Sequence, residues 1–352
     1  MTRYASRILF RADATPELGG GHVMRCLALA RALHERDIDV AFASCPGSTA
    51  IAPALARSGI PVTEARGAAD FGFPPGWNGK ADAIFVDLYT STADDETRMR
   101  THADIIAVIE DLPDRPHDCD ILVDPLPGGS PMAYSGRVPG RCHVMAGGGF
   151  ALIRPEFAAL RSATLERRRA DTPVRRILVS MGLTDLGGIS DRVTRLVLDA
   201  MPDANVEVVL GPGAASREPL ESLADREPRL QVLIDIDDMA ARMSRADLAI
   251  GAGGGTSLER CALGLPSIAV ILADNQREAT ALLHRDGALL AIDEPGHVAA
   301  ELPDLLRRLT PRACTDMALR AASVCDGRGA ERVADALLAQ IDGQAEGAST
   351  HV

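Results

Sequence analysis

The chain has 352 residues, of which 46% are hydrophobic and only 3% aromatic, and its formal net charge is -12. This length is sufficient for two domains with full cores. The negative charge and the scarcity of aromatic rings exclude a broad nucleic-acid or anionic-membrane surface, because such a surface needs a basic face and, for single strands, stacking rings.

Strand and helix patterns alternate through the first part of the chain. The predicted strands cover residues 7–11, 40–43, 84–86, 105–109 and 121–123, and the predicted helices cover residues 22–36, 49–57 and 93–102. Residues 125–149 are rich in Pro and Gly and are predicted to form a surface loop. Pro155 stands at the start of a further helix, where proline is favoured.

A second alternating series follows a charged stretch, residues 161–175, which is predicted to be a linker. Its predicted strands cover residues 177–180, 206–210, 232–234, 248–250 and 268–272. A last helix is expected at residues 330–341, and the polar tail 342–352 is expected to be disordered. Strands that are apolar throughout indicate parallel sheets buried on both faces.

The predicted fold is therefore α/β, with two doubly wound Rossmann-like domains facing across a cleft. The predicted boundaries are residues 1–160 for the first domain, 161–175 for the linker and 176–327 for the second domain. Residues 328–352 form the C-terminal helix and tail.

The seven cysteines are widely scattered and contain no CxxC pair. This pattern indicates reduced thiols in the cytoplasm rather than a disulfide or zinc framework. The N-terminal residues MTRYASRILF lack the apolar core of a signal peptide, and no apolar run is long enough to span a bilayer. We expect a cytoplasmic protein and make no prediction of its oligomeric state.

The most informative stretch is a glycine-rich turn after the strand at residues 248–250. It consists of Gly253, Gly254 and Gly255, where the absence of Cβ atoms lets the backbone approach a ligand. Thr256 or Ser257 is expected to cap the helix that follows, and Gly264 to end it. Unpaired N–H groups at a helix start suit a diphosphate. The alternative is an ordinary strand-to-helix turn.

Two polar groups near this turn favour a nucleotide. Glu259 lies in the first helical turn, where its carboxylate can accept two ribose hydroxyls. Asp274, Asn275 and Gln276 end the next strand at the same carboxyl edge of the sheet. Because these features occur together, the stretch predicts a nucleotide-binding site.

The first strand also leads into a glycine-rich turn. Gly20 and Gly21 precede His22, which begins a helix, and Arg25 follows one turn later. The helix dipole disfavours an imidazolium there, so His22 is expected to be neutral near pH 7 and able to accept a proton. Arg25 is expected to meet a phosphate or an acid. The alternative is that His22 is only a polar residue at a helix start.

Further polar residues end the other strands of the first half. Asp87 and Tyr89 follow a buried strand; Tyr89 could contact a sugar, or Asp87 could cap the next helix and Tyr89 merely cover the sheet. Several carboxylates surround His117, and Asp118 and Asp120 have a spacing seen in metal-dependent sugar transferases. The Pro-rich context favours turns and caps, so neither a metal nor another cofactor is predicted.

With both turns considered, the chain resembles a known family. FRADATPELGGGHVMRCLALARAL, VDLY, EDLPDRPHDCDILVDP, GGGFALIRPEF and IGAGGGTSLERCALGLPSIAVILADNQ are similar to the nucleotide-sugar hydrolases of pseudaminic acid biosynthesis. Those enzymes release UDP from UDP-2,4-diacetamido-2,4,6-trideoxy-β-L-altropyranose. The blocks fall throughout residues 7–276. The second half also resembles the nucleotide-binding half of the transferase that adds N-acetylglucosamine to lipid II precursors.

The resemblance implies the glycosyltransferase-B architecture, with UDP held by the second domain. It implies that His22 is the general base and that Arg154 and Glu259 contact substrate. Its remaining binding positions surround the diphosphate or uridine, or line the sugar: Gly254, Gly255, Thr256, Ser257, Asn275, Gln276 and, from the other domain, Tyr89. The chain departs from the family at SMGLTDLGG, where Leu183 replaces a frequent glycine and the Pro usual after Asp185 is missing. The roles of Thr184 and Asp185 are therefore left open.

The expected function is metal-independent hydrolysis of a UDP-linked diacetamido sugar, with inversion at the anomeric carbon. The alternatives are a glycosyltransferase that uses His22 on an acceptor alcohol and a protein that binds a UDP-sugar without reaction. A nicotinamide enzyme is poorly supported, because the first turn is not GxGxxG.

Overall fold

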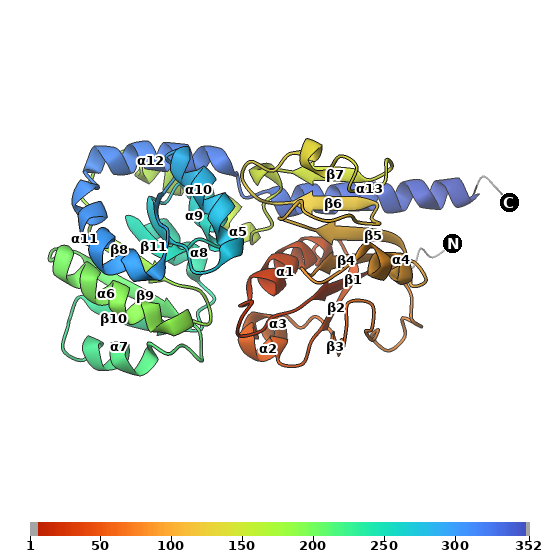
Figure 1. Ribbon diagram of the computed structural model, residues 1–352, viewed down its shortest axis with the longest axis horizontal. Coiled ribbons are helices and arrows are strands. Elements are labelled where there is room, and N and C mark those ends of the chain that lie inside the picture. Colours follow the sequence, from red (N-terminus) through yellow and green to blue (C-terminus); the bar gives the residue numbers. More distant parts are fainter. Residues whose placement is uncertain (1–5, 350–352) are drawn as a thin grey trace. The chain divides into compact units, whose positions relative to one another are not determined.

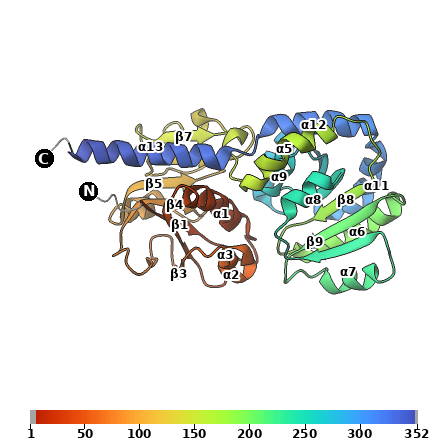
Figure 2. The same cartoon turned by 180° about the vertical axis from the view of Figure 1, so that it is seen from behind.

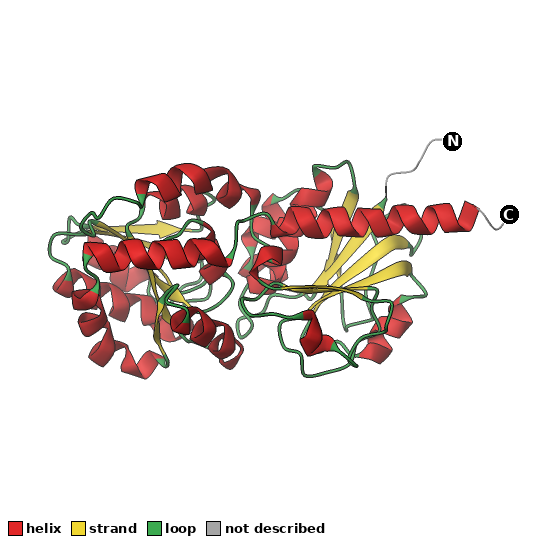
Figure 3. Cartoon of the chain, turned by 90° about the horizontal axis from the view of Figure 1, so that it is seen from above, coloured by secondary structure: helices red, strands yellow, loops and turns green. Residues whose placement is uncertain are grey.

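The computed structural model describes residues 6–349 and divides into two compact units (Figure 1). Unit 1 contains the chain up to Pro155 together with the segment from Arg328 onward, and unit 2 contains Glu156–Gly327. Each unit has one parallel sheet with helices on both faces (Figure 3). The predicted pair of doubly wound α/β folds is therefore present.

Unit 1 has a seven-stranded sheet in the order β3-β2-β1-β4-β5-β6-β7. Its strands are β1 (Arg7–Ala12), β2 (Asp39–Ser44), β3 (Val62–Glu64), β4 (Ala81–Asp87), β5 (Ala103–Ile109), β6 (Ile121–Asp124) and β7 (His143–Ala146). The central strands are held in register by stacked rings: Phe10 of β1 lies opposite both Phe42 and Phe85, at centroid distances of 5.1 and 5.3 Å. Such pairs stabilise neighbouring strands.

Four helices and the C-terminal segment surround this sheet. They are α1 (Gly21–His34), α2 (Ser48–Ile51), α3 (Pro53–Arg57), α4 (Ala93–Met99) and α13 (Gly329–Ser349). Helix α13 returns from unit 2 and runs along unit 1 (Figure 2). Val333 and Leu337 of α13 are fully buried in the same apolar cluster as Leu27 of α1, so the C-terminal segment completes the core of unit 1.

Unit 2 has a six-stranded sheet in the order β10-β9-β8-β11-β12-β13. Its strands are β8 (Arg176–Ser180), β9 (Asn205–Leu210), β10 (Leu230–Ile234), β11 (Leu248–Ala252), β12 (Ser267–Val270) and β13 (Leu290–Ile292). Its helices are α5 (Pro155–Arg167), α6 (Ile189–Ala200), α7 (Arg217–Ala224), α8 (Met239–Arg245), α9 (Thr256–Ala262), α10 (Arg277–Arg285), α11 (Val298–Arg308) and α12 (Pro311–Val324). Parallel pairing brings the carboxyl ends of all strands of a unit to one edge, where ligands bind in such sheets.

The structure differs from the sequence-based expectations in several elements. Strands β3, β7 and β13 were not predicted; β7 lies within residues 125–149 and pairs with β6 at Ile121↔His143. The single helix expected at residues 49–57 is two short helices, because Ala52 has non-helical backbone angles before Pro53. Edge strands of three or four residues carry too little apolar periodicity to be recognised.

The segments joining the units also differ from expectation. Helix α5 extends to Arg167 and lies almost entirely in unit 2, so the first part of the predicted linker, residues 161–167, is helical. Within the basic cluster, the guanidinium of Arg168 is buried and donates to three backbone carbonyls of unit 2, whereas Arg167 and Arg169 are exposed. The disorder expected for the tail is wrong up to Ser349, because α13 continues to that residue; positions 350–352 lie outside the described residues.

Candidate functional site

The first candidate site lies at the carboxyl edge of the unit 1 sheet. Gly20 is the N-cap of α1 and provides no side chain, and Gly21 begins the helix. His22 is therefore held at the helix start, where it is only 7% exposed. Strand β4 lies beside β1 and ends at Asp87, which is paired in register with Ala12. This adjacency places the Asp87 carboxylate 2.6 Å from His22 Nδ1.

Arg25 binds the same carboxylate from one turn further along α1. Its Nε and Nη2 atoms each donate to Asp87 at 2.6 Å, and its Nη1 atom donates to Asp111 at 2.7 Å. Burial opposes ionisation of Asp87, but the charges and hydrogen bonds of Arg25 and His22 outweigh it and lower the Asp87 pKa well below its usual range. The Arg25 guanidinium therefore meets acids, and these hold its position.

This arrangement defines the chemical capacity of His22. Because Nδ1 is engaged with Asp87, Nε2 is the ring nitrogen left to accept a proton. The ring of Tyr89 lies edge-on to the imidazole, with centroids 4.7 Å apart and an interplanar angle of 89°. Sequence reasoning identified His22, Arg25 and Tyr89 as site residues but left Asp87 open between an edge position and a helix cap. The cap of α4 is Thr92, so the capping alternative for Asp87 is wrong.

The acidic stretch that follows β5 has a structural role. Burial disfavours the charged form of His117, but Glu110 and Glu96 outweigh this and raise its pKa to about 9. The Nδ1 atom of His117 lies 2.8 Å from Glu96 Oε1. Asp118 and Asp120 both bind Arg100. Among residues 6–349, no group of three or more His, Cys, Asp or Glu side chains has the arrangement of a metal site.

The second candidate site is the glycine turn between β11 and α9 in unit 2. The Gly253 N–H donates to Val270 O at 3.0 Å, whereas no described residue accepts a hydrogen bond from the N–H of Gly254 or Gly255. A Cβ on Gly253 would overlap Thr280 Oγ1, so glycine is required there, while the space beside Gly255 is open. The turn thus presents two successive free amide donors, as anion sites do.

The helix after this turn is capped differently from the prediction. Gly255 is the N-cap and supplies no side chain, so neither Thr256 nor Ser257 is the cap. The Ser257 hydroxyl instead accepts a hydrogen bond from Arg260 at 2.8 Å. Gly264, with φ of +55°, follows the helix end as predicted. Arg260 was not identified from the sequence as a site residue.

The polar residues after β12 form a short 3-10 helix, Asp274–Gln276, near the turn. Gln276 Oε1 accepts from Leu272 N at 3.0 Å, and its Nε2 atom lies 3.6 Å from where a Gly254 Cβ would stand. The exposed Asp274 pairs with Arg277, whereas Glu259 is half-buried in the first turn of α9. Gln276 therefore packs beside the glycine turn.

Two other positions that the sequence singled out are Arg154 and Asp185. Arg154 is half-buried and directly precedes α5. Asp185, whose role was open, has a φ of 45° and accepts hydrogen bonds from the N–H groups of Ser190 and Ser216. Asp185 is buried to 1% exposure, so it organises its own loop and the start of α6.

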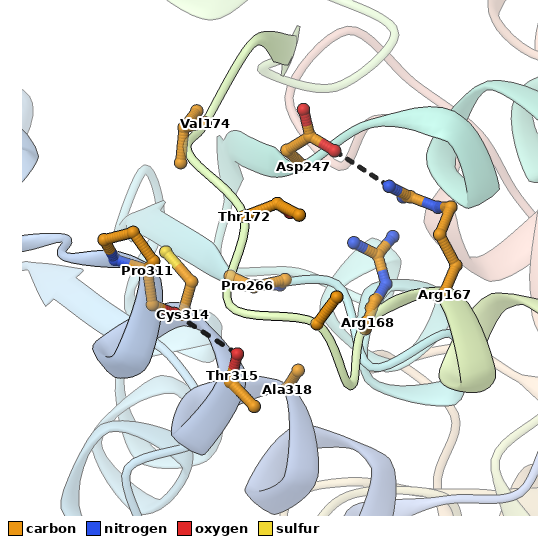
Figure 4. A pocket seen from close by; sticks show the side chains of 11 residues that line it. Arg167, Arg168, Thr172, Val174, Asp247, Pro266, Pro311, Cys314, Thr315 and Ala318 are labelled. Atoms are coloured by element: carbon orange, nitrogen blue, oxygen red, sulfur yellow. Dashed lines mark hydrogen bonds and ion pairs between the residues drawn. The ribbon is translucent and has the colours of Figure 1, made fainter.

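A hollow in unit 2 lies away from these residues (Figure 4). It is lined by Val174, Asp247 and Pro266, which directly precede or adjoin the amino ends of β8, β11 and β12. Arg167 forms an ion pair with Asp247 there, at 2.8 Å, and the guanidinium of Arg168 donates hydrogen bonds to three backbone carbonyls. It is at the opposite sheet edge from the one where such folds bind ligands.

The sequence matches one family model and is similar to relatives of two kinds, a hydrolase and a transferase. Residues 190–336 match the glycosyltransferase family 28 C-terminal domain. A UDP-2,4-diacetamido-2,4,6-trideoxy-beta-L-altropyranose hydrolase of Campylobacter jejuni is 23% identical over 80% of this chain and 97% of its own length. A UDP-N-acetylglucosamine--N-acetylmuramyl-(pentapeptide) pyrophosphoryl-undecaprenol N-acetylglucosamine transferase of Ralstonia nicotianae is 32% identical, but the match covers only 53% of each protein.

Solved structures establish the fold class. MurG of Acinetobacter baumannii superposes with a TM-score of 0.64 at 18% identity, covering 95% of this chain and 99% of that one. At this identity the likeness concerns the fold alone. The chain has the two parallel-sheet α/β domains of the glycosyltransferase-B class, and it is similar in sequence to the C. jejuni hydrolase.

Proposed function

We propose that this protein hydrolyses a UDP-linked 2,4-diacetamido-2,4,6-trideoxy sugar, releasing UDP and the free sugar with inversion at the anomeric carbon. The observation that carries the proposal is the buried His22–Asp87 contact of 2.6 Å at the carboxyl edge of unit 1. The similarity to the C. jejuni hydrolase supports the same reaction, because it extends over 97% of that enzyme.

His22 is the proposed general base. Its Nε2 atom takes a proton from water while the water oxygen forms a bond to the anomeric carbon. Asp87, which holds Nδ1, stabilises the imidazolium that results. General-base assistance of this kind accelerates reactions by about 10²–10⁴-fold.

The proposed role of unit 2 is to bind the UDP leaving group and stabilise its charge. The bond between the anomeric carbon and the diphosphate oxygen breaks, and its electron pair leaves with UDP. The free amides of Gly254 and Gly255 are the proposed donors to this charge, and preorganised donors of this type supply a large share of rate enhancement. This part of the mechanism requires no metal, because backbone donors carry the stabilisation.

The remaining predicted residues have proposed binding roles. Glu259 binds the ribose hydroxyls, Thr256 and Ser257 adjoin the diphosphate or uridine, and Asn275 and Gln276 contact the sugar side of the substrate. Tyr89 and Arg154 of unit 1 are assigned to the sugar, and Asp274 supports the adjoining loop through Arg277.

Replacement of His22 tests the proposed base. His22→Asn is expected to lower UDP release at least about 100-fold, because the base is lost, while affinity for UDP remains. Release of UDP would be followed by chromatography and binding by calorimetry. A variant that keeps near-normal turnover contradicts the mechanism.

A glycosyltransferase is the second candidate, favoured by the family 28 match and by the Ralstonia nicotianae relative. It would use His22 to deprotonate an acceptor alcohol. A hydrolase releases UDP from the UDP-sugar in the absence of any acceptor, whereas a transferase requires one. A protein that only binds the UDP-sugar would return it unchanged, so one product assay separates all three.

The proposal also includes a cytoplasmic location and a place in pseudaminic (nonulosonic) acid biosynthesis, of which flagellin glycosylation is one use. All seven cysteines are free thiols, which agrees with a reducing compartment. Within residues 6–349, every helix is too short or too polar to cross a membrane.

A further inference from the structure

Arg260 carries a buried charge that has no ion-pair partner among the described residues. It lies on α9, is 1% exposed and is the largest fully buried side chain among the described residues. No carboxylate of that part of the chain lies within 4.0 Å of its guanidinium; the acidic groups that raise its pKa are its two chain neighbours, Cys261 and Glu259. Burial lowers the pKa of Arg260 to about 10, so the side chain remains charged at neutral pH.

The guanidinium is attached to the glycine turn. Its Nη2 atom donates to Ala252 O at 2.9 Å and to Ser257 Oγ at 2.8 Å, so it joins the end of β11 to the start of α9. A Cβ on Gly251 would overlap the Nη1 atom, which shows how closely the group packs under the strand end. The Nε atom is buried and has no hydrogen-bond partner.

Such a charge is costly unless something compensates it. Buried ions in proteins are normally paired, because removal from water disfavours the charged form by several kcal/mol. Arg168 of the same unit illustrates another solution, since its guanidinium donates to three backbone carbonyls. Arg260 makes one carbonyl contact and one hydroxyl contact, and both partners flank the two amides that have no protein acceptor.

We propose that Arg260 is a positioning residue for a nucleoside diphosphate: it fixes the Ala252–Ser257 turn from behind and provides the buried positive charge that the bound diphosphate neutralises. This inference rests on the proposed function, because it requires a diphosphate at the turn. Charges interact more strongly in the protein interior than in water, so the effect must grow with the negative charge of the ligand.

The test compares UDP with uridine, which has no phosphate. Affinities of both would be measured by calorimetry for wild type, Arg260→Met and Arg260→Lys, with Arg168→Met as a control for losing a buried arginine elsewhere in unit 2. In Arg260→Met, the preference for UDP over uridine is expected to fall about tenfold or more, which corresponds to about 1.4 kcal/mol. Arg260→Lys keeps the charge and most of the preference, and Arg168→Met keeps all of it.

The outcomes separate the inference from the proposed function. Wild-type protein that binds UDP no better than uridine overturns the proposed function, and the inference with it. If wild-type protein prefers UDP over uridine and Arg260→Met shows the same preference, the inference about Arg260 is overturned but the proposed function is not. Equal losses of UDP and uridine affinity also overturn it, because they indicate a purely structural clamp. Should Arg260→Met not fold, Arg260→Gln replaces it in the same comparison.

Discussion

Replacement of Asp87 by Asn separates the chemical role of this carboxylate from its structural role. Asn has nearly the same shape but no charge, and its amide nitrogen cannot accept the hydrogen bond that the second carboxylate oxygen, Oδ2, accepts from Arg25 Nε. In wild type, Asp87 is 1% exposed and receives one contact from His22 and two from Arg25, each of 2.6 Å. The substitution therefore leaves Arg25 with Asp111 as its one charged partner.

Two magnitudes follow from these contacts. Breaking a buried ion pair costs about 3–5 kcal/mol of unfolding free energy; we expect the lower end, because Asn retains one acceptor and Asp111 remains. Loss of the carboxylate also allows the tautomer of His22 that carries its proton on Nε2, in which Nε2 cannot act as the base. In the Ser-His-Asp arrangement the equivalent change lowers kcat by about 10⁴-fold, and here we expect a loss of about 10²–10⁴-fold. UDP release and urea unfolding measure the two effects.

Asp111→Asn is the matched control. Asp111 contacts Arg25 at 2.7 Å and has no contact with His22, so its replacement weakens the same guanidinium without touching the imidazole. It is expected to reduce stability but to leave UDP release within about tenfold of wild type. If Asp87→Asn retains wild-type turnover, or Asp111→Asn loses as much, the argued function of the His22–Asp87 contact is refuted.

Two other predictions concern stability. The pKa of His117 is about 9 in the folded state and about 6.5 in the unfolded state, so its contribution to stability is fully present below pH 6.5 and is lost as the pH rises through 9. In urea unfolding, the free energy of unfolding of His117→Gln should therefore change by roughly 3 kcal/mol less than that of wild type over this pH range. The same pH profile in variant and wild type would contradict the stabilising role of the buried pairs between His117 and its two glutamates. Gly253→Ala should destabilise unit 2 by about 1–3 kcal/mol because its Cβ overlaps Thr280, whereas Gly255→Ala should stay within about 0.5 kcal/mol; equal thermal shifts would contradict this.

Much of the fold could be predicted because the central strands are apolar throughout. Both sheets, both glycine turns and the helix beginning near His22 were recognisable from local sequence. Three of the four edge strands, β3, β7 and β13, were not recognised, whereas the edge strand β10 was; β3, for example, has three residues and one large apolar side chain. The C-terminal tail was misjudged because polar composition alone does not reveal that a helix is anchored by buried residues such as Leu337.

The partner of His22 could not be found by local pattern. His22 and Asp87 are 65 residues apart, and they meet because β4 lies beside β1. Because β3 was not recognised, the strand that ends at Asp87 was counted as the third strand of the sheet. Once β3 is included it is the fourth, and the doubly wound strand order places the fourth strand beside the first. Arg260 was missed for another reason. An arginine in a helix is ordinarily expected at the surface, and only the three-residue spacing from Ser257 hinted at a shared buried face.

The central claim is most directly tested with the UDP-linked diacetamido sugar in water enriched in ¹⁸O, with no acceptor present. The account predicts that UDP is released without ¹⁸O, because water attacks the sugar carbon and the diphosphate keeps its own oxygens. NMR during the first turnovers should show the inverted anomer. Entry of ¹⁸O into UDP, or no UDP release until an acceptor is added, would contradict the account.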